Sequence, residues 1–225
     1  MTRWNDCADA DLKIDDLVGE PCYIGLDLAS KLDIAAMVFL FPRPDGKFAL
    51  FGKYYVPESR LNPDNNNNAA QYHAWSRAGK LCVTPGNIID FSYIKDDLLD
   101  FAKRFEVVEV CYDPFQATQF VVEVGAQGLT MVEVGATLKN FSEPMKRLEA
   151  LVEDNKLAHD GDPVMTWMMS CVTGHYDKKE NIYPNKEGKD AKIDGPVAAI
   201  MALSRAQLHA MDNASAYDDH GILTT

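Results

Sequence analysis

The chain has 225 residues, 47% of them apolar and 25% charged, a balance that is typical of a globular protein with a buried core. Its formal net charge of −12 argues against a free-standing, high-affinity nucleic-acid binder, because such binding depends on phosphate neutralisation, although an enzyme could still meet phosphates through metal ions. The longest apolar run, residues 34–41, is too short to cross a bilayer, and no signal-like leader opens the chain, so we expect neither membrane insertion nor secretion.

The first part of the chain predicts an arm followed by an antiparallel sheet. Residues 1–20 are polar and acidic with little periodicity, and we predict that they form a linker or arm. Three strand patterns follow, at residues 22–28, 34–41 and 48–56. A turn that ends in Gly46 separates the last two strands, so the three are expected to pair as an antiparallel meander.

The rest of the chain alternates between helix and strand patterns. The predicted elements are helices at 72–77, 92–105, 115–126, 142–155, 162–172 and 194–210, with strands at 107–112 and 130–134. The order helix, strand, helix, strand from Ser92 to Val134 predicts parallel strand pairing.

Together these elements predict an α/β fold of the ribonuclease H-like arrangement. In this arrangement a mixed sheet, with three antiparallel strands followed by parallel strands, is flanked by helices, and the first and fourth strands lie side by side. We predict one domain over residues 21–210 and a flexible C-terminal tail over residues 211–225.

Three aspartates each begin or end a different apolar segment. Asp27 closes the first predicted strand, Asp113 follows the fourth, and Asp194 precedes the last helix. A carboxylate at the end of a buried strand is costly unless a cation meets it, so we expect the three to converge on one site. Their oxygens suit Mg²⁺ or Mn²⁺, and two such ions about 3.5–4 Å apart would activate water and stabilise a leaving oxygen.

Plainer interpretations stay open for several of these residues. Each aspartate has an alternative role as a turn former or helix cap. His159 could orient a ligand or contact DNA, or it could be structural. The histidines and the five scattered cysteines show no zinc spacing, and neither a G-x-S-x-G motif nor a G-x-x-x-x-G-K-[ST] phosphate-binding loop occurs.

Four segments resemble motifs of the C-terminal nuclease domain of tailed-bacteriophage large terminase subunits. Residues 23–36 (YIGLDLASKLDIAA) are similar to the first nuclease motif, 111–116 (CYDPFQ) to the second acidic motif, and 192–199 (KIDGPVAA) to the third. Residues 159–164 (HDGDPV) resemble a further segment that is common in this family. The resemblance runs from residue 21 to about residue 210, with the four motifs in order at compatible spacing.

This resemblance implies a metal-dependent endodeoxyribonuclease that cuts concatemeric double-stranded DNA during viral genome packaging, by two-metal phosphodiester hydrolysis. It makes Asp27, Asp113 and Asp194 the catalytic ligands of two divalent ions, Mg²⁺ or Mn²⁺. Asp33 matches a further acidic position and would be an accessory ligand or neighbour, with a capping role in the turn as the alternative. Large terminases also carry an N-terminal ATPase, whose phosphate-binding loop is missing from this sequence.

The implied partners are double-stranded DNA, the terminase ATPase domain, the small terminase subunit and the portal protein, in the cytoplasm of an infected bacterial host. Lys189 and Lys192 are the candidates for contact with phosphate, although their segment is barely positive and a solvated hairpin is the plainer interpretation. Two alternative functions stay open. One is a non-catalytic ribonuclease H-like assembly module, which the acidic composition favours, and the other is a junction-resolving or transposase-like nuclease.

Overall fold

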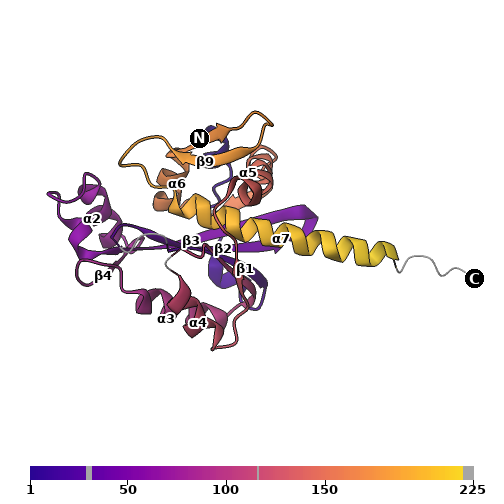
Figure 1. The fold of residues 1–225 in the computed structure, drawn as a ribbon, viewed down its shortest axis with the longest axis horizontal. Helices are drawn as coiled ribbons and strands as arrows, with labels where there is room; N and C mark the ends of the chain where they lie inside the picture. The colour runs from indigo at the N-terminus through magenta and orange to yellow at the C-terminus, as the bar shows by residue number, and fades with distance from the viewer. Residues whose placement is uncertain (29–31, 116, 220–225) are drawn as a thin grey trace, which may run out of the picture.

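A mixed sheet of seven strands forms the centre of the computed structural model, which describes residues 1–28, 32–115 and 117–219 (Figure 1). The strand order is β4-β3-β2-β1-β5-β6, and β7 pairs with β3 beside β4. The strands are β1 (Pro21–Asp27), β2 (Ala35–Arg43), β3 (Lys47–Pro57), β4 (Cys82–Thr84), β5 (Glu106–Tyr112), β6 (Met131–Glu133) and β7 (Leu157–His159). Residues 29–31 of the first motif, Gln116 of the second and 220–225 of the predicted tail lie outside the described residues.

The strand directions confirm the predicted mixed sheet. β1 pairs with β2, and β2 with β3, in antiparallel fashion. β5, the fourth predicted strand, pairs in parallel with β1, and β6 pairs in parallel with β5. The first and fourth predicted strands are therefore neighbours.

Side chains that alternate along β2 enter two separate cores. Val38 and Leu40 belong to the core on one face of the sheet, whereas Met37 and Phe39 belong to the core on the other. Helices lie on both sides of the sheet in Figure 1, with α5, α6 and α7 on the first face and α3 and α4 on the second. Their bounds are α3 (Phe91–Ala102), α4 (Thr118–Gly125), α5 (Leu138–Glu153), α6 (Pro163–Ser170) and α7 (Asp194–Asp219).

Smaller elements complete the fold. A separate antiparallel hairpin consists of β8 (Val172–Tyr176) and β9 (Ile182–Lys186), and it packs near α5 (Figure 1). The remaining helices are α1 (Thr2–Asp6), α2 (Ala69–Arg77) and three short 3-10 turns, Ile14–Leu17, Pro44–Gly46 and Glu58–Leu61. Among the described helices, none combines the length and the apolar character that crossing a membrane requires.

The N-terminal residues differ from the predicted linker. Trp4 of α1 is buried, its ring stacks on His159 with centroids 4.0 Å apart, and its Nε1 donates to Thr166 Oγ1 at 3.2 Å. Cys7 and Leu17 are buried as well. The average composition of this segment is polar, but a few apolar side chains are enough to attach it to the domain.

The C-terminal helix also differs from its prediction. Helix α7 runs to Asp219 instead of ending near Ala210, so the first part of the predicted tail at 211–225 is helical. The polar composition of these residues suggested a loose segment, but polar side chains are no obstacle to the continuation of a helix that is already formed. The flexibility of the tail stays a prediction.

Helix caps and short strands account for other differences between the predicted and the observed elements. The Asp90 carboxylate accepts the backbone N–H of Ser92, so Asp90 and not Ser92 caps α3. Thr137 Oγ1 accepts the N–H of Asn140, which starts α5 at Leu138, four residues before the predicted start. Strands β4 and β7 are three residues long, too short for an alternating pattern to show in the sequence.

Candidate active site

The ends of β1 and β5 place two of the predicted ligands side by side. Asp27 is the last residue of β1, and Asp113 directly follows β5. The parallel register sets Leu26 opposite Tyr112, so the next residue of each strand lies at the same edge of the sheet. Asp27 is buried and Asp113 is partly buried, so both carboxylates are at least partly withdrawn from water.

Helix α7 packs directly on β1. A Cβ atom added to Gly25 would lie 1.8 Å from the carbonyl oxygen of Ala198, so only glycine permits this approach. The helix is buried along residues 198–203, which form part of the core on this face. Asp194 lies about one turn before Ala198, so the close contact fixes its height above the sheet.

The start of α7 lies over the row of residues that includes Asp27. A Cβ atom added to Gly195 would be 3.3 Å from the ring of Tyr54 on β3. Tyr54 pairs with Ala36 of β2, and Ala36 pairs with Asp27 of β1. The fold therefore brings Asp194 to the edge of the sheet at which Asp27 ends.

Asp194 is an unusual carboxylate. It is buried, and its Oδ2 has no hydrogen-bond partner among the described residues. Burial raises the pKa of Asp194 to about 6, against the opposing influence of Lys186, and the negative charge of Asp33 adds to the rise. A buried carboxylate oxygen without a partner is costly, and a hard cation is the kind of ligand that would satisfy it.

Asp113 is held by the backbone. Its Oδ1 accepts the N–H of Phe115 at 2.9 Å, and its Oδ2 accepts the N–H of Ala136 at 2.7 Å. The turn-forming role considered for this aspartate is therefore real. It does not exclude ligand binding, since each carboxylate oxygen keeps a second lone pair.

Asp33 forms an ion pair with Lys192, one of the two lysines predicted to contact DNA. The two side chains are only 18% and 15% exposed. Asp33 Oδ1 also accepts the N–H of its neighbour Ile34 at 3.0 Å, which matches the capping alternative. Lys189, by contrast, is exposed, and of the two lysines it is the one free of this ion pair and open to solvent.

Two tyrosines that the sequence prediction missed lie near these carboxylates. The pKa of Tyr183 is raised by burial and then by the negative charges of Asp113 and Asp27. The pKa of Tyr72 is raised by burial and then by Asp33 and Asp194. Tyr183 stands between Ile182 and Pro184 in a segment that was predicted only as polar, and this short apolar interruption was the available signal.

His159 has a structural role. Burial lowers its pKa, so the imidazole is neutral near pH 7. Its Nδ1 accepts the N–H of Gly161 at 3.1 Å, which leaves Nε2 to donate to the carbonyl oxygen of Trp4 at 2.9 Å. With both nitrogens engaged and the ring stacked on Trp4, this side chain is not available to a ligand or to DNA.

The donor set suits a hard cation, although its members are partly engaged with other groups. Within the described ranges, no group of three or more His, Cys, Asp or Glu side chains is placed to hold a metal ion as it stands. Backbone N–H groups occupy Asp113, and Lys192 occupies Asp33. The buried Oδ2 of Asp194 is the atom that best fits a metal ligand, because the described residues provide it with no other partner.

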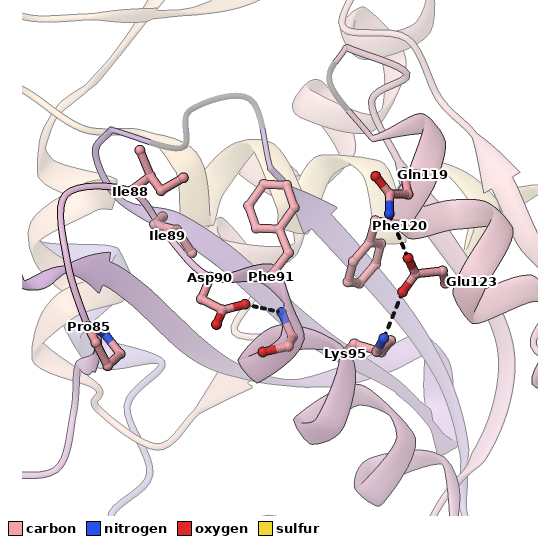
Figure 2. A pocket seen from close by; sticks show the side chains of 10 residues that line it. Pro85, Ile88, Ile89, Asp90, Phe91, Lys95, Gln119, Phe120 and Glu123 are labelled. Atoms are coloured by element: carbon pink, nitrogen blue, oxygen red, sulfur yellow. Dashed lines mark hydrogen bonds and ion pairs between the residues drawn. The ribbon is translucent and has the colours of Figure 1, made fainter.

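A hollow of about 510 Å³ lies away from these carboxylates, between α3 and α4 (Figure 2). Lys95 from α3 and Gln119 from α4 both contact Glu123, the lysine at 2.7 Å and the glutamine at 2.9 Å. Apolar side chains such as Phe120 form much of the remaining wall. None of the predicted site residues is among the residues that line this hollow, so the hollow does not mark the candidate site.

Comparison with known proteins supports a specific family. The model of the family described as "Terminase large subunit, endonuclease domain" matches residues 2–210. Protein YmfN of Escherichia coli (strain K12) is 34% identical over 219 residues, which are 93% of this chain and 48% of that protein. The large terminase subunit of Enterobacteria phage HK97 is 28% identical over 199 residues, which are 88% of this chain and 40% of that protein. The chain therefore spans less than half the length of these curated relatives.

Solved structures agree with the family match. The crystal structure of the HK97 bacteriophage large terminase aligns with a TM-score of 0.80 at 27% identity, covering 91% of this chain and 42% of that one. The large terminase nuclease from thermophilic phage G20c aligns with a TM-score of 0.55 at 14% identity, covering 82% of this chain and 81% of that one. At this low identity, the second likeness shows the fold alone.

The mixed sheet, the helices on both faces and the carboxylates at adjacent strand ends define an α/β domain of the ribonuclease H-like nuclease class. The family match extends over nearly the whole chain and identifies one family within this class. The chain belongs to the family of terminase large subunit endonuclease domains. The resemblance found in the sequence motifs is thereby confirmed.

Proposed function

We propose that the chain is a metal-dependent DNA endonuclease that hydrolyses phosphodiester bonds of concatemeric double-stranded DNA during viral genome packaging. Asp27, Asp113 and Asp194 would hold two divalent ions, Mg²⁺ or Mn²⁺, with Asp33 beside them. The observation that carries this proposal is the buried Oδ2 of Asp194, which has no partner among the described residues and lies above the ends of β1 and β5. Structures of the G20c terminase nuclease, which shares the fold, are described with bound magnesium and with bound cobalt.

The residues of the chain contribute position and charge. When bound, divalent ions would lower the pKa of a water molecule and stabilise the leaving oxygen. The adjacent ends of β1 and β5 carry Asp27 and Asp113, and two backbone N–H groups fix the orientation of Asp113. Asp194, the first residue of α7, is buried, and its withdrawal from water strengthens its attraction for a cation.

The partners are part of the same proposal. Double-stranded DNA would be the substrate, and the terminase ATPase domain, the small terminase subunit and the portal protein would be the other components, in the cytoplasm of an infected bacterial host. The net charge of −12 supports a division of labour in which these components hold the DNA while this domain cuts it. Of the two candidate lysines, the exposed Lys189 is the better placed to contact phosphate.

The test is the replacement of Asp194 by Asn. Because a neutral amide at this buried position costs less than a charge, the fold should persist. We expect Mn²⁺-dependent plasmid cleavage to fall by at least roughly 100-fold, since a ligand with a full charge is lost. Asp113→Asn should have the same effect. Asp96→Asn, an exposed carboxylate on α3, is the matched control and should cleave like the wild type.

The outcome also separates the alternatives. Equal cleavage by the wild type, Asp194→Asn and Asp113→Asn would remove these aspartates from the chemistry. A wild type that does not cleave with Mg²⁺ or Mn²⁺, even at low salt, would favour the non-catalytic assembly module. Preferential cutting of four-way junctions over linear duplex would favour a junction-resolving nuclease.

A further inference from the structure

A short chain of hydrogen bonds leads from the β8–β9 hairpin to Asp113. The hydroxyl of Tyr183 on β9 donates to the carbonyl oxygen of Ala136 at 3.1 Å. The N–H of Ala136 donates to Oδ2 of Asp113 at 2.7 Å. Ala136 is therefore bonded on one side to the candidate ligand and on the other to the tyrosine.

The loop around Ala136 is also held by its neighbours. On the side of Asp113, the N–H of Val134 donates to the carbonyl oxygen of Tyr112 at 2.8 Å. Gly135 accepts bonds from the N–H of Thr137 at 2.8 Å and from Asn140 Nδ2 at 2.9 Å, which tie the loop to the start of α5. These bonds hold the residues that flank Ala136. The carbonyl group of Ala136 itself is held by Tyr183.

Tyr183 is itself fixed from α5. Its ring stacks on Phe141 with centroids 5.7 Å apart and planes 15° apart. The backbone N–H of the preceding Ile182 donates to Oγ of Ser142 at 3.1 Å. Phe141 and Ser142 are both buried, so the tyrosine ring has a rigid support and its hydroxyl is left to hold the loop.

The electrostatic surroundings agree with this position. Burial raises the pKa of Tyr183, and the negative charges of Asp113 and Asp27 raise it further, so the phenol lies close enough to interact with both carboxylates. The phenol is neutral near pH 7 and can act as a hydrogen-bond donor. Removing the hydroxyl would change the bond to Ala136 and leave the ring contact in place.

We propose that Tyr183 is a positioning residue for the metal site, which holds Oδ2 of Asp113 in its binding orientation through Ala136. This inference rests on the proposed role of Asp113 as a metal ligand. It assigns a function to one atom of the hairpin, the Tyr183 hydroxyl. A purely structural tyrosine would support the hairpin through its ring and would have no influence on metal affinity.

The experiment compares Tyr183→Phe with the wild type. Phenylalanine keeps the stacking on Phe141 and removes the hydroxyl. The electron paramagnetic resonance signal of free Mn²⁺ gives the Mn²⁺ affinity of each protein, and circular dichroism gives its melting temperature. We expect the apparent dissociation constant for Mn²⁺ to rise by roughly 10-fold, the lower end for loss of an outer-shell partner, and cleavage to recover at saturating Mn²⁺.

Tyr176→Phe is the matched control. This tyrosine lies on β8 of the same hairpin and is 59% exposed, so its substitution should leave Mn²⁺ affinity unchanged. Unchanged Mn²⁺ affinity of Tyr183→Phe would overturn the inference. The comparison with Asp113→Asn distinguishes the two proposals. If that variant loses Mn²⁺ affinity while Tyr183→Phe keeps it, only the role of Tyr183 fails, whereas a wild type that binds no Mn²⁺ overturns both.

A second measurement applies if Tyr183→Phe does not fold. In the wild type, titration with Mg²⁺ followed by amide resonances should shift Ala136 together with Asp113, because the two are directly bonded. Asp96 on α3 gives the reference signal and should not move. An Ala136 resonance that stays in place while Asp113 shifts would overturn the inference.

Discussion

At the scale of single residues, the carboxylates of the candidate site differ in how far their charge is satisfied by neighbouring groups. Asp113 is satisfied by two backbone N–H groups, and Asp33 beside the site is satisfied by Lys192. Asp194 is buried with one oxygen that has no described partner, so its charge costs stability in the absence of a cation. A site that is costly without its ligand is a common feature of functional centres.

The free-energy cost of burying the ionised Asp194 carboxylate predicts that the stability of the fold depends on pH. The folded pKa of about 6 lies above the ordinary value of 3.8, so the folded state binds this proton more tightly than the unfolded state. The stability contributed by the protonated group is present below pH 3.8 and is lost as the pH rises to about 6. The loss amounts to at most roughly 3 kcal/mol.

Asp194→Asn should remove this loss. In metal-free buffer at about pH 7.5, the variant should melt at a higher temperature than the wild type, and the two should converge near pH 4. Thermal melts in EDTA across this pH range provide the measurement. Added Mn²⁺ should raise the melting temperature of the wild type and not that of the variant. Parallel pH profiles for the two proteins would contradict the assignment of the buried charge.

At the scale of elements, the contact between α7 and β1 determines where Asp194 lies. Gly25 and Ala198 approach so closely that no side chain fits between the strand and the helix. The same helix reaches β5 farther along, where Arg205 and His209 both contact the buried Glu109. Helix α7 therefore crosses the sheet, with its first turn held near the end of β1.

Gly25→Ala should disturb this crossing. The new Cβ would meet backbone atoms, which cannot rotate away, so we expect a destabilisation of about 3 kcal/mol or more. Metal affinity should fall in the fraction that folds, because α7 must move away from β1 and carries Asp194 with it. Urea denaturation measures the first effect. The matched control is Gly188→Ala, a site with no atom within 4 Å of the added Cβ, where little change is expected.

At the scale of the whole molecule, the net charge determines how strongly the domain can be attracted to DNA. With 34 acidic and 22 basic residues, the domain has no general electrostatic attraction for a polyanion. Several lysines that could contact phosphate are already paired with carboxylates, among them Lys53 with Asp97 and Lys95 with Glu123. Under the proposed function, attraction for DNA would then come from bound metal ions or from other components of the packaging machine.

This charge predicts weak, metal-dependent binding by the isolated chain. In EDTA at near-physiological salt, a labelled duplex should bind with a dissociation constant above roughly 100 µM. Replacing EDTA by Ca²⁺ should tighten binding in the wild type and not in Asp194→Asn. Fluorescence anisotropy gives both values. Submicromolar binding without any divalent ion would show a basic surface that the composition does not predict.

The sequence by itself determined the order and type of the main elements, because alternation and helical spacing are local properties of the chain. It also determined the edge of the sheet at which Asp27 and Asp113 lie, since Asp27 ends one apolar strand, Asp113 directly follows another, and those strands pair in the predicted way. The composition of residues 1–20, however, did not predict that Trp4 would pack on a histidine 155 residues away.

Only the tertiary structure decided how the site is supported. Lys192 meets Asp33 across 159 residues, and Tyr183 reaches Asp113 only through a backbone contact at Ala136. Neither partner can be identified from spacing, because an ion pair between residues so far apart in the chain and a hydrogen bond to the backbone both leave no pattern of residue types in the sequence. The buried state of Asp194 likewise depends on a helix that crosses the sheet. The sequence named the three carboxylates, and the packing of α7 determined which of them is left in need of a cation.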